Sequence, residues 1–482
     1  MARASNGKSD GTTMKMPAYL EKSRSEISAS FQELEWKQRF RLFHAMENPN
    51  TSPYKVDRSD VVVSRNRYGN VQPWDASRIK LKTPICGSDY VNASPIVLKR
   101  HVLDSPNITG RPPAYEAKYI ATQGPKQGQK SHFWHMVHQE VSGDTGVIIM
   151  LTQIVEDSKE KCGQYYPSDL DDPTMSLLHE EKPVGGESSG RLNGEDPFLD
   201  SDYIPGTDCE EANNQTDSTT TDSTEPELGS SDTITLLSKE FDSSVRCEVR
   251  KLRLLINDEP KTIIHYLFGR WPDFGKPDVE DRRALVELSR RTYDEAGGSA
   301  RIVHCSAGVG RTGTWIALDF LVREVEDGCL LDNVHSGDRP PKDSGVGATK
   351  QETLTGPGPP KLNTPTQEDG FDKDDYDLIF ETVNTLREQR MMMVIREVQY
   401  SFLYDVVREA TLEKYRSTPE GAVVKETESS ESQAHRAKQP RIPDEATVDS
   451  GSDAETEIIG TDDDPYAAVS PDILRRGLSQ EF

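Results

Sequence analysis

The segment Val303-His304-Cys305-Ser306-Ala307-Gly308-Val309-Gly310-Arg311-Thr312-Gly313 places a cysteine and an arginine six positions apart. A short apolar stretch, Ala300 to Val303, precedes this segment, and an apolar-periodic stretch, Thr314 to Asp327, follows it. We therefore predict a strand, a loop and a helix in succession. Backbone amides in such a loop, together with the positive N-terminal end of the helix, bind anions. The segment thus predicts a phosphate-binding site.

Cys305 and Arg311 supply reactive groups to that site. The field that binds an anion also stabilises a thiolate, so we expect Cys305 to be a nucleophile. The planar guanidinium of Arg311 matches phosphate oxygens, and Gly308 and Gly310 let an anion approach the backbone. A lone cysteine is more often a small buried hydrophobic residue, but here the arginine and the glycines accompany it. The combination indicates transfer of phosphate from an ester to sulfur.

These residues resemble the signature loop of the cysteine-dependent protein phosphatases. Upstream, Trp271-Pro272-Asp273-Phe274-Gly275-Lys276-Pro277 resembles the acid-bearing loop of the protein tyrosine phosphatases. A carboxyl group is needed there to protonate the leaving phenolate and later to deprotonate the attacking water. The prolines stiffen the loop and the glycine lets it bend, which suits a lid that closes over substrate. The resemblance implies that Asp273 is the general acid.

Other segments match the same family in the same order. Asn66-Arg67-Tyr68 resembles the loop whose tyrosine walls a deep pocket, which admits phosphotyrosine and keeps the shorter phosphoserine from the thiolate. The family usually has Asp where this chain has Asn70, which keeps one acceptor oxygen but loses the charge that clamps the substrate peptide. The resemblance implies that Glu156 pairs with Arg311 and that Lys161 meets the closed acid loop. A solvated surface charge pair is the alternative for Glu156 and Lys161.

A second departure concerns hydrolysis of the phosphocysteine. Ile395 falls where the family usually has a glutamine that positions the attacking water, and isoleucine has no hydrogen-bonding group. Gln399 lies four residues later and, if this stretch is helical, on the same face. We therefore expect Gln399 to replace the missing glutamine, or the second step to be slow.

The resemblance implies three groups of site residues. The catalytic group comprises Cys305, Arg311, Asp273, Thr312, His304 and Gln399. The substrate-binding group comprises Tyr68, Asn70, Ser306, Ala307, Gly308, Val309, Gly310, Phe274 and Asp273. The supporting group comprises Glu156, Lys161 and Trp271. Of the catalytic group, Thr312 would help the thiolate to leave, and His304 would order the loop rather than transfer protons.

The chain is thus identified as a member of the phosphotyrosine-specific, non-receptor protein tyrosine phosphatases, and its long polar insertions resemble those of fungal members. The expected substrates are phosphotyrosine proteins; the family and the fungal character favour activated mitogen-activated protein kinases. Two alternatives stay open. Ile395 favours a slow-turnover scaffold that binds phosphotyrosine, and the signature loop is shared with the dual-specificity phosphatases, which Tyr68 disfavours.

Acidic residues are concentrated in segments that we predict to be disordered. The formal net charge is −25; residues 168–232 carry −16 and residues 410–482 carry −8, so the rest is nearly neutral. Residues 328–372 are rich in Pro, Gly and Asp. Such segments cannot bury a core. We therefore expect a catalytic domain over residues 27–409 with surface insertions at 168–232 and 328–372, and disordered ends at 1–26 and 410–482.

The fold expected from the resemblance is an α/β domain, with a central twisted mixed sheet flanked by helices and the Cys-x5-Arg loop between a strand and a helix. The six cysteines show no C-x-x-C spacing, and the histidines show no ligand spacing, so we expect neither disulfides nor a metal, and the mechanism needs no cofactor. With no signal peptide and no long apolar span, we predict a cytoplasmic location, extending to the nucleus. Acidic insertions disfavour nucleic-acid binding, and we expect a monomer.

Overall fold

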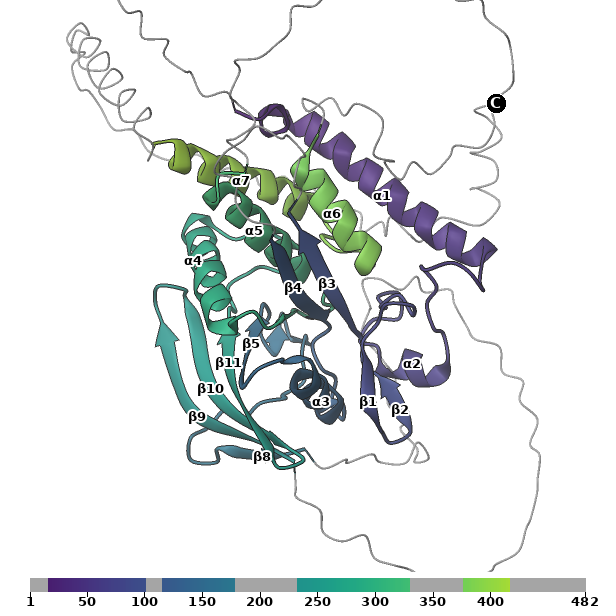
Figure 1. Cartoon of the computed structure of the whole chain (residues 1–482), viewed down its shortest axis with the longest axis vertical. Coiled ribbons are helices and arrows are strands. Elements are labelled where there is room, and N and C mark those ends of the chain that lie inside the picture. Colours follow the sequence, from purple (N-terminus) through teal and green to yellow (C-terminus); the bar gives the residue numbers. More distant parts are fainter. Residues whose placement is uncertain (1–15, 101–114, 178–231, 330–375, 417–482) are drawn as a thin grey trace, which may run out of the picture.

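A computed structural model describes residues 16–100, 115–177, 232–329 and 376–416. Eight strands form one mixed sheet in the order β3-β4-β12-β5-β11-β10-β9-β8 (Figure 1). The strands are β3 (Ala93–Lys99), β4 (Glu116–Thr122), β5 (Thr145–Met150), β8 (Thr174–Ser176), β9 (Thr233–Asp242), β10 (Cys247–Ile256), β11 (Glu259–Leu267) and β12 (Arg301–His304). The middle strands β4, β12, β5 and β11 run parallel, and the outer pairs are antiparallel. The mixed α/β fold class predicted from the sequence is confirmed.

The central strand β5 is buried on both faces of the sheet. Val147, Ile149 and Leu151 face one hydrophobic cluster, whereas Ile148 and Met150 face the other. Successive side chains of a strand point to opposite faces, so a continuous run of apolar residues is what a strand covered on both sides requires. This arrangement places β12, the neighbour of β5, in the most shielded part of the sheet.

Helices cover the two faces of the sheet unequally. The helices are α1 (Arg24–Glu47), α2 (Asp60–Arg65), α3 (Lys130–Glu140), α4 (Val279–Ala296), α5 (Gly310–Glu326), α6 (Leu378–Gln389), α7 (Glu397–Arg416) and the 3-10 turn η1 (Ala18–Glu21). Helices α4 to α7 lie over one face, and α1 packs outside α6 and α7 (Figure 1). On the other face, α3 packs against β10 and β1 (Lys80–Ile85), which pairs with β2 (Ser88–Tyr90). A small hairpin, β6 (Val155–Glu156) with β7 (Lys159–Glu160), completes the elements.

Expected and observed boundaries differ at the insertions and at the C-terminal end. β8 lies within the range 168–232 that the sequence predicts to be a surface insertion, yet it pairs with β9 and extends the sheet. The expected insertion therefore contains an ordered strand, whereas residues 168–172 are exposed as a surface loop would be. Most of the remaining residues to 232, and most of 328–372, lie outside the described residues. Helix α7 continues past residue 409 to Arg416, and Thr411 in this extension is buried. These stretches are polar in composition, yet strand pairing and helix packing order short parts of them.

A buried ion pair joins the elements on either side of the signature loop. Arg301 at the start of β12 donates to the carboxylate of Asp319 in α5, with 2.7 Å between Nη1 and Oδ1. Ser289 of α4 donates to the same carboxylate at 2.6 Å, and the Tyr119 hydroxyl of β4 donates to its other oxygen. Asp319 is fully buried. This network fixes α5 on the sheet at the far end of the strand that carries the loop.

We predict that Asp319→Ala destabilises the fold by about 3–5 kcal/mol, because it leaves the Arg301 charge buried and unpaired. The midpoint of urea unfolding measures the loss. Arg290→Ala is the matched control, since Arg290 pairs with Glu326 at 2.7 Å but is half exposed. The control should cost at most about 1 kcal/mol. Similar losses in the two variants would contradict this account of the Asp319 network.

Candidate active site

The signature loop turns its backbone carbonyls outward. The Ser306 carbonyl accepts a hydrogen bond from the Gly124 amide at 2.8 Å. Arg390 donates from Nε to the Gly308 carbonyl at 2.9 Å and from Nη2 to the Ala307 carbonyl at 3.2 Å. Because each peptide unit is planar, a carbonyl held outward directs the amide of the next residue inward. The amides of the loop therefore converge on its centre, where they bind an anion.

Arg390 is itself fixed by the residues around it. It is fully buried, and its Nη2 also donates to Asn92 Oδ1 at 2.7 Å, while its Nη1 donates to Ser94 Oγ at 3.3 Å. Burial lowers the pKa of Arg390 to about 10, which still leaves it charged at neutral pH. Its positive charge therefore adds to the loop's field while its donors hold the loop's shape.

Gly308 is required by the geometry of the loop. Its φ is +72°, and a Cβ at this position would lie 2.2 Å from the Thr122 carbonyl oxygen. No side chain fits there. In this conformation the Gly308 amide donates to Cys305 Sγ at 3.3 Å. The close approach of the loop to β4 thus aims a backbone donor at the sulfur.

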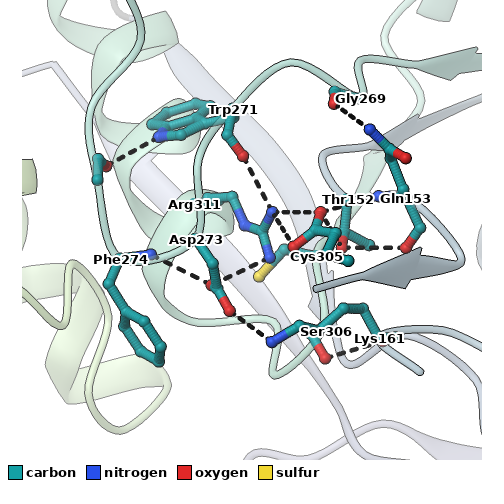
Figure 2. A network of polar contacts seen from close by, with 12 residues as sticks. Thr152, Gln153, Lys161, Gly269, Trp271, Asp273, Phe274, Cys305, Ser306 and Arg311 are labelled. Atoms are coloured by element: carbon teal, nitrogen blue, oxygen red, sulfur yellow. Dashed lines mark hydrogen bonds and ion pairs between the residues drawn. The ribbon is translucent and has the colours of Figure 1, made fainter. Parts of the chain in front are cut away.

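Arg311 lies beside Cys305 in the first turn of α5 (Figure 2). Its Nη1 donates to both carboxylate oxygens of Glu156, at 2.8 and 3.0 Å, and to the Trp271 carbonyl at 3.1 Å. Only 2% of the Arg311 side chain is exposed. Glu156 is therefore no solvated surface charge: it orients the guanidinium plane and leaves Nη2 directed into the site.

The loop that carries Asp273 closes over this arginine (Figure 2). Asp273 Oδ1 accepts from Arg311 Nη2 at 3.2 Å, and Oδ2 accepts from Lys161 Nζ at 2.6 Å. Within the loop, the Trp271 indole donates to the Gly275 carbonyl at 3.1 Å. The carboxylate thus lies on the same side of Arg311 as Cys305, with Lys161 as a second cation beside it.

Tyr68 borders the site opposite the Asp273 loop. Its hydroxyl lies 2.8 Å from Ser306 Oγ, and Ser306 donates its own proton to the Lys161 carbonyl at 2.8 Å. The Tyr68 hydroxyl is therefore the donor in the first contact. Burial raises the pKa of Tyr68, which keeps the phenol neutral. Asn70 follows on the same loop, between α2 and β1, and is half-buried.

Ile395 and Gln399 both reach the signature loop. A Cβ built on Gly310 would lie 3.0 Å from Ile395 Cγ2 and 3.2 Å from Gln399 Nε2. Ile395 precedes the start of α7, so the expectation that one helix face presents both residues is wrong, although both lie against the loop. Thr312, in the first turn of α5, is fully buried, and its hydroxyl has no hydrogen-bond partner within the described residues.

Comparisons with known proteins agree with this geometry. The model of a family described as protein-tyrosine phosphatase matches residues 62–179 and 209–336, about half of the chain. The chain belongs to the protein-tyrosine phosphatase family. It is 28% identical over 401 residues to tyrosine-protein phosphatase 1 of Saccharomyces cerevisiae, covering 81% of this chain and 96% of that protein. The recognition from sequence, including the likeness to fungal members, is confirmed.

Two further relatives align with this chain over a smaller share of their own length. Tyrosine-protein phosphatase 2 of Schizosaccharomyces pombe is 29% identical over 351 residues, which cover 73% of this phosphatase and 34% of the relative. Human tyrosine-protein phosphatase non-receptor type 2 is 26% identical over 306 residues, which cover 63% and 57% of the two chains. The match is thus shared by fungal and human non-receptor proteins.

Behind the loop of this phosphatase, a chain of hydrogen bonds runs through the sheet. The Tyr165 hydroxyl lies 2.7 Å from Nε2 of His304 and 2.7 Å from Nε2 of His265. His304 Nδ1 faces the Cys305 carbonyl at 3.1 Å, so it carries the proton and Nε2 accepts from Tyr165. Tyr165 then accepts from His265, whose Nδ1 faces an Arg250 donor at 3.5 Å. These contacts assign every proton along this series of hydrogen bonds.

Both histidines are neutral in this arrangement. Burial lowers the pKa of His304 to about 4, and burial together with the charge of Arg250 lowers the pKa of His265 well below its ordinary value. A second proton on His304 Nε2 would leave the Tyr165 hydroxyl without an acceptor, and a second proton on His265 Nδ1 would face the Arg250 donor. Among the contacts of the described residues, His304 supports the Cys305 backbone and does not reach the sulfur.

Several supporting residues were missed by the sequence reasoning. Arg390, Tyr165, His265 and Arg67 were given no role, yet they hold the loops of the site. Arg67 donates to the Gly124 and Pro125 carbonyls at 3.2 and 2.8 Å. An arginine directly after an apolar-periodic helix, as at Arg390, is the one signal in the sequence, because a charge in an apolar setting needs partners.

The described residues hold neither a metal-ligand cluster nor a helix that could span a membrane. There, no three His, Cys, Asp or Glu side chains are grouped so that they could hold a metal ion. Among the helices of the same residues, none combines the length and the apolar character needed to cross a bilayer.

We predict that His265→Gln weakens the dependence of stability on pH below about pH 6. In the wild type the unfolded chain binds a proton at this residue but the folded chain does not, so stability is lost as pH falls through the ordinary histidine range. One histidine contributes up to about 1.4 kcal/mol per pH unit. Denaturant unfolding between pH 5 and pH 7 measures the slope. An unchanged slope in the variant would show that His265 is protonated in the folded state.

Proposed function

We propose that this phosphatase hydrolyses phosphotyrosine in proteins in two steps, through a phosphocysteine on Cys305. The observation that carries the proposal is the convergence of Cys305, Arg311 and Asp273 at one point, with Asp273 Oδ1 3.2 Å from Arg311 Nη2. A nucleophile, an anion-binding fork and an acid within reach of one phosphate are the parts that this reaction requires.

In the first step, the Cys305 thiolate attacks phosphorus and the bond from phosphorus to the tyrosine oxygen breaks. The equatorial oxygens are held by Arg311 and by the inward amides from Ser306 to Gly310, which stabilise the charge of the transition state. Asp273 gives its proton to the departing phenolate. Glu156 and Lys161 support this step by orienting Arg311 and Asp273.

In the second step, Asp273 takes a proton from a water, the water oxygen bonds to phosphorus, and the bond from phosphorus to sulfur breaks. Gln399 offers the amide that positions this water, because its side chain lies against Gly310 where Ile395 offers only carbon. The unpartnered hydroxyl of Thr312 supplies a proton donor to the leaving thiolate. The products are inorganic phosphate and the free thiolate.

Selectivity for phosphotyrosine is assigned to the depth of the pocket. Tyr68, tied to Ser306, walls the entrance on one side, and Phe274 follows the acid on the other. Only 4% of Cys305 is exposed, so a substrate must reach inward to meet the sulfur. A phenyl ring provides that reach and a serine methylene does not. Asn70 adds an uncharged acceptor for the backbone of the substrate peptide.

Activated mitogen-activated protein kinases are the substrates that we favour, in the cytoplasm and the nucleus, with the phosphatase acting as a monomer. A slow-turnover scaffold is the second candidate, and Ile395 is the observation in its favour, since it leaves one side of the water site apolar. A dual-specificity phosphatase is disfavoured by the wall that Tyr68 forms.

We predict that Cys305→Ser abolishes phosphate release from a phosphotyrosine peptide, because the nucleophile is lost. Asp273→Ala should bind substrate yet turn over at least about a hundredfold more slowly, as expected for loss of a general acid. Rates on a phosphoserine peptide of the same sequence are the control for selectivity. Full activity of Cys305→Ser, or equal rates on the two peptides, would refute the proposal. Proteins from cell extract retained by the Asp273→Ala variant show whether the substrates include these kinases.

A second prediction concerns the water site. If Ile395 slows hydrolysis of the phosphocysteine, the wild type should release a burst of tyrosine product before a slower steady rate, and Ile395→Gln should raise only the steady rate. If Gln399 already positions the water, Ile395→Gln has no effect and Gln399→Ala lowers the steady rate instead. Rapid-quench measurements separate the two. Accumulation of phosphocysteine without turnover would support the scaffold.

A further inference from the structure

We propose that Arg396 is a positioning residue that holds the Asp273 loop closed through the ring of Phe274. The proposal rests on the function proposed above and assigns this step to a residue outside the family motifs that identify the chain. Arg396 lies between Ile395 and the start of α7, and its guanidinium carbon is 4.7 Å from the centroid of the Phe274 ring. A cation over an aromatic face at this distance is attracted to the ring.

The backbone and surroundings of Arg396 make it a firm support. Its carbonyl accepts from the amides of Gln399 and Tyr400, at 3.0 and 3.1 Å, so it anchors the first turn of α7. Its side chain is half-buried, and the Nε atom is buried with no hydrogen-bond partner within the described residues. The guanidinium is therefore partly removed from water, which strengthens its attraction to the ring.

Phe274 needs such a support because its backbone is unfavourable. Its φ is +55°, in the left-handed region that residues other than glycine and asparagine seldom adopt. Figure 2 shows the ring pointing away from Arg311 while the neighbouring Asp273 carboxylate points toward it. This conformation turns the acid inward and the ring outward, and a contact that fixes the ring also fixes the acid.

The other contacts of the loop act at different points. Asp273 is held by Arg311 and Lys161, but Arg311 must give its donors to phosphate when substrate binds. Lys276 pairs with Asp405 of α7 at 3.2 Å, with side chains 44% and 32% exposed, and such a pair contributes little. The Arg396 contact acts on the ring of Phe274, and it does not compete with the phosphate.

The test uses leaving groups of different basicity. Arg396→Ala should lower kcat/KM about three- to tenfold on a phosphotyrosine peptide, whose leaving group needs the acid, in line with loss of a partly buried cation–π contact. It should change kcat/KM less than about twofold on 2,4-dinitrophenyl phosphate, whose leaving group departs without a proton. Arg396→Lys should restore part of the loss. Arg323→Ala is the matched control, because Arg323 stacks on Tyr293 at 3.5 Å in a contact with no part in the site.

A double-mutant cycle supplies the second measurement. Phe274→Leu should cause a similar selective loss, and the combined variant should lose less than the product of the two single losses. An equal loss on both substrates would mean that Arg396 supports the fold and would overturn the proposal. A loss confined to KM for acidic peptides would make Arg396 a substrate contact and would also overturn it.

A different outcome would show that the proposed function itself is wrong. In that case Asp273→Ala itself would not distinguish the two leaving groups, and the Arg396 proposal falls with it. If Asp273→Ala does distinguish them but Arg396→Ala does not, only the Arg396 proposal is refuted.

Discussion

The site depends on the hydrogen bonds that the buried guanidinium of Arg390 donates to the signature loop. A loop of small residues has many conformations of similar energy, and its amides converge only if its carbonyls have partners elsewhere. Arg390 supplies those partners to two successive carbonyls, and Asn92 and Ser94 on and before β3 fix its position. A charge so buried is costly unless its donors are all used, and here they are used to shape the phosphate cup.

The parts of the site that chemistry dictates could be predicted from sequence, because they are local. Cys305, Arg311 and the glycines between them are neighbours in the chain, and Asp273 lies in a short motif of its own. Arg390, Tyr165 and His265 could not be found in this way. They contact backbone or side-chain groups between about 80 and 140 positions away, and nothing in their immediate sequence states which carbonyl or ring they will meet.

The fold likewise has parts that the sequence predicts and parts that it does not. The apolar run of β5 and the periodicity of α5 predict buried elements, since every residue of β5 from Val147 onward has an apolar partner on one face or the other. The strand β8 escaped prediction because it has only three residues, two of them polar, and its order comes from pairing with β9, which is a property of the partner. Ile395 and Gln399 were linked by an assumed helix face, whereas the chain bends at Val394, whose φ is +58°. Turns of this kind bring residues together by a route that periodicity does not describe.

The hydrogen-bond chain from Arg250 to Cys305 has a consequence for how the enzyme responds to acidity. With both rings neutral and each proton assigned, the electrostatic background behind Cys305 is constant across the physiological range. Histidine is the side chain that most readily makes a protein sensitive to small changes in cellular pH, and here two of them lie beneath the reacting sulfur without introducing that sensitivity. The sheet thus insulates the nucleophile: a shift in pH inside the cell reaches it through solvent at the mouth of the pocket and not through the protein beneath.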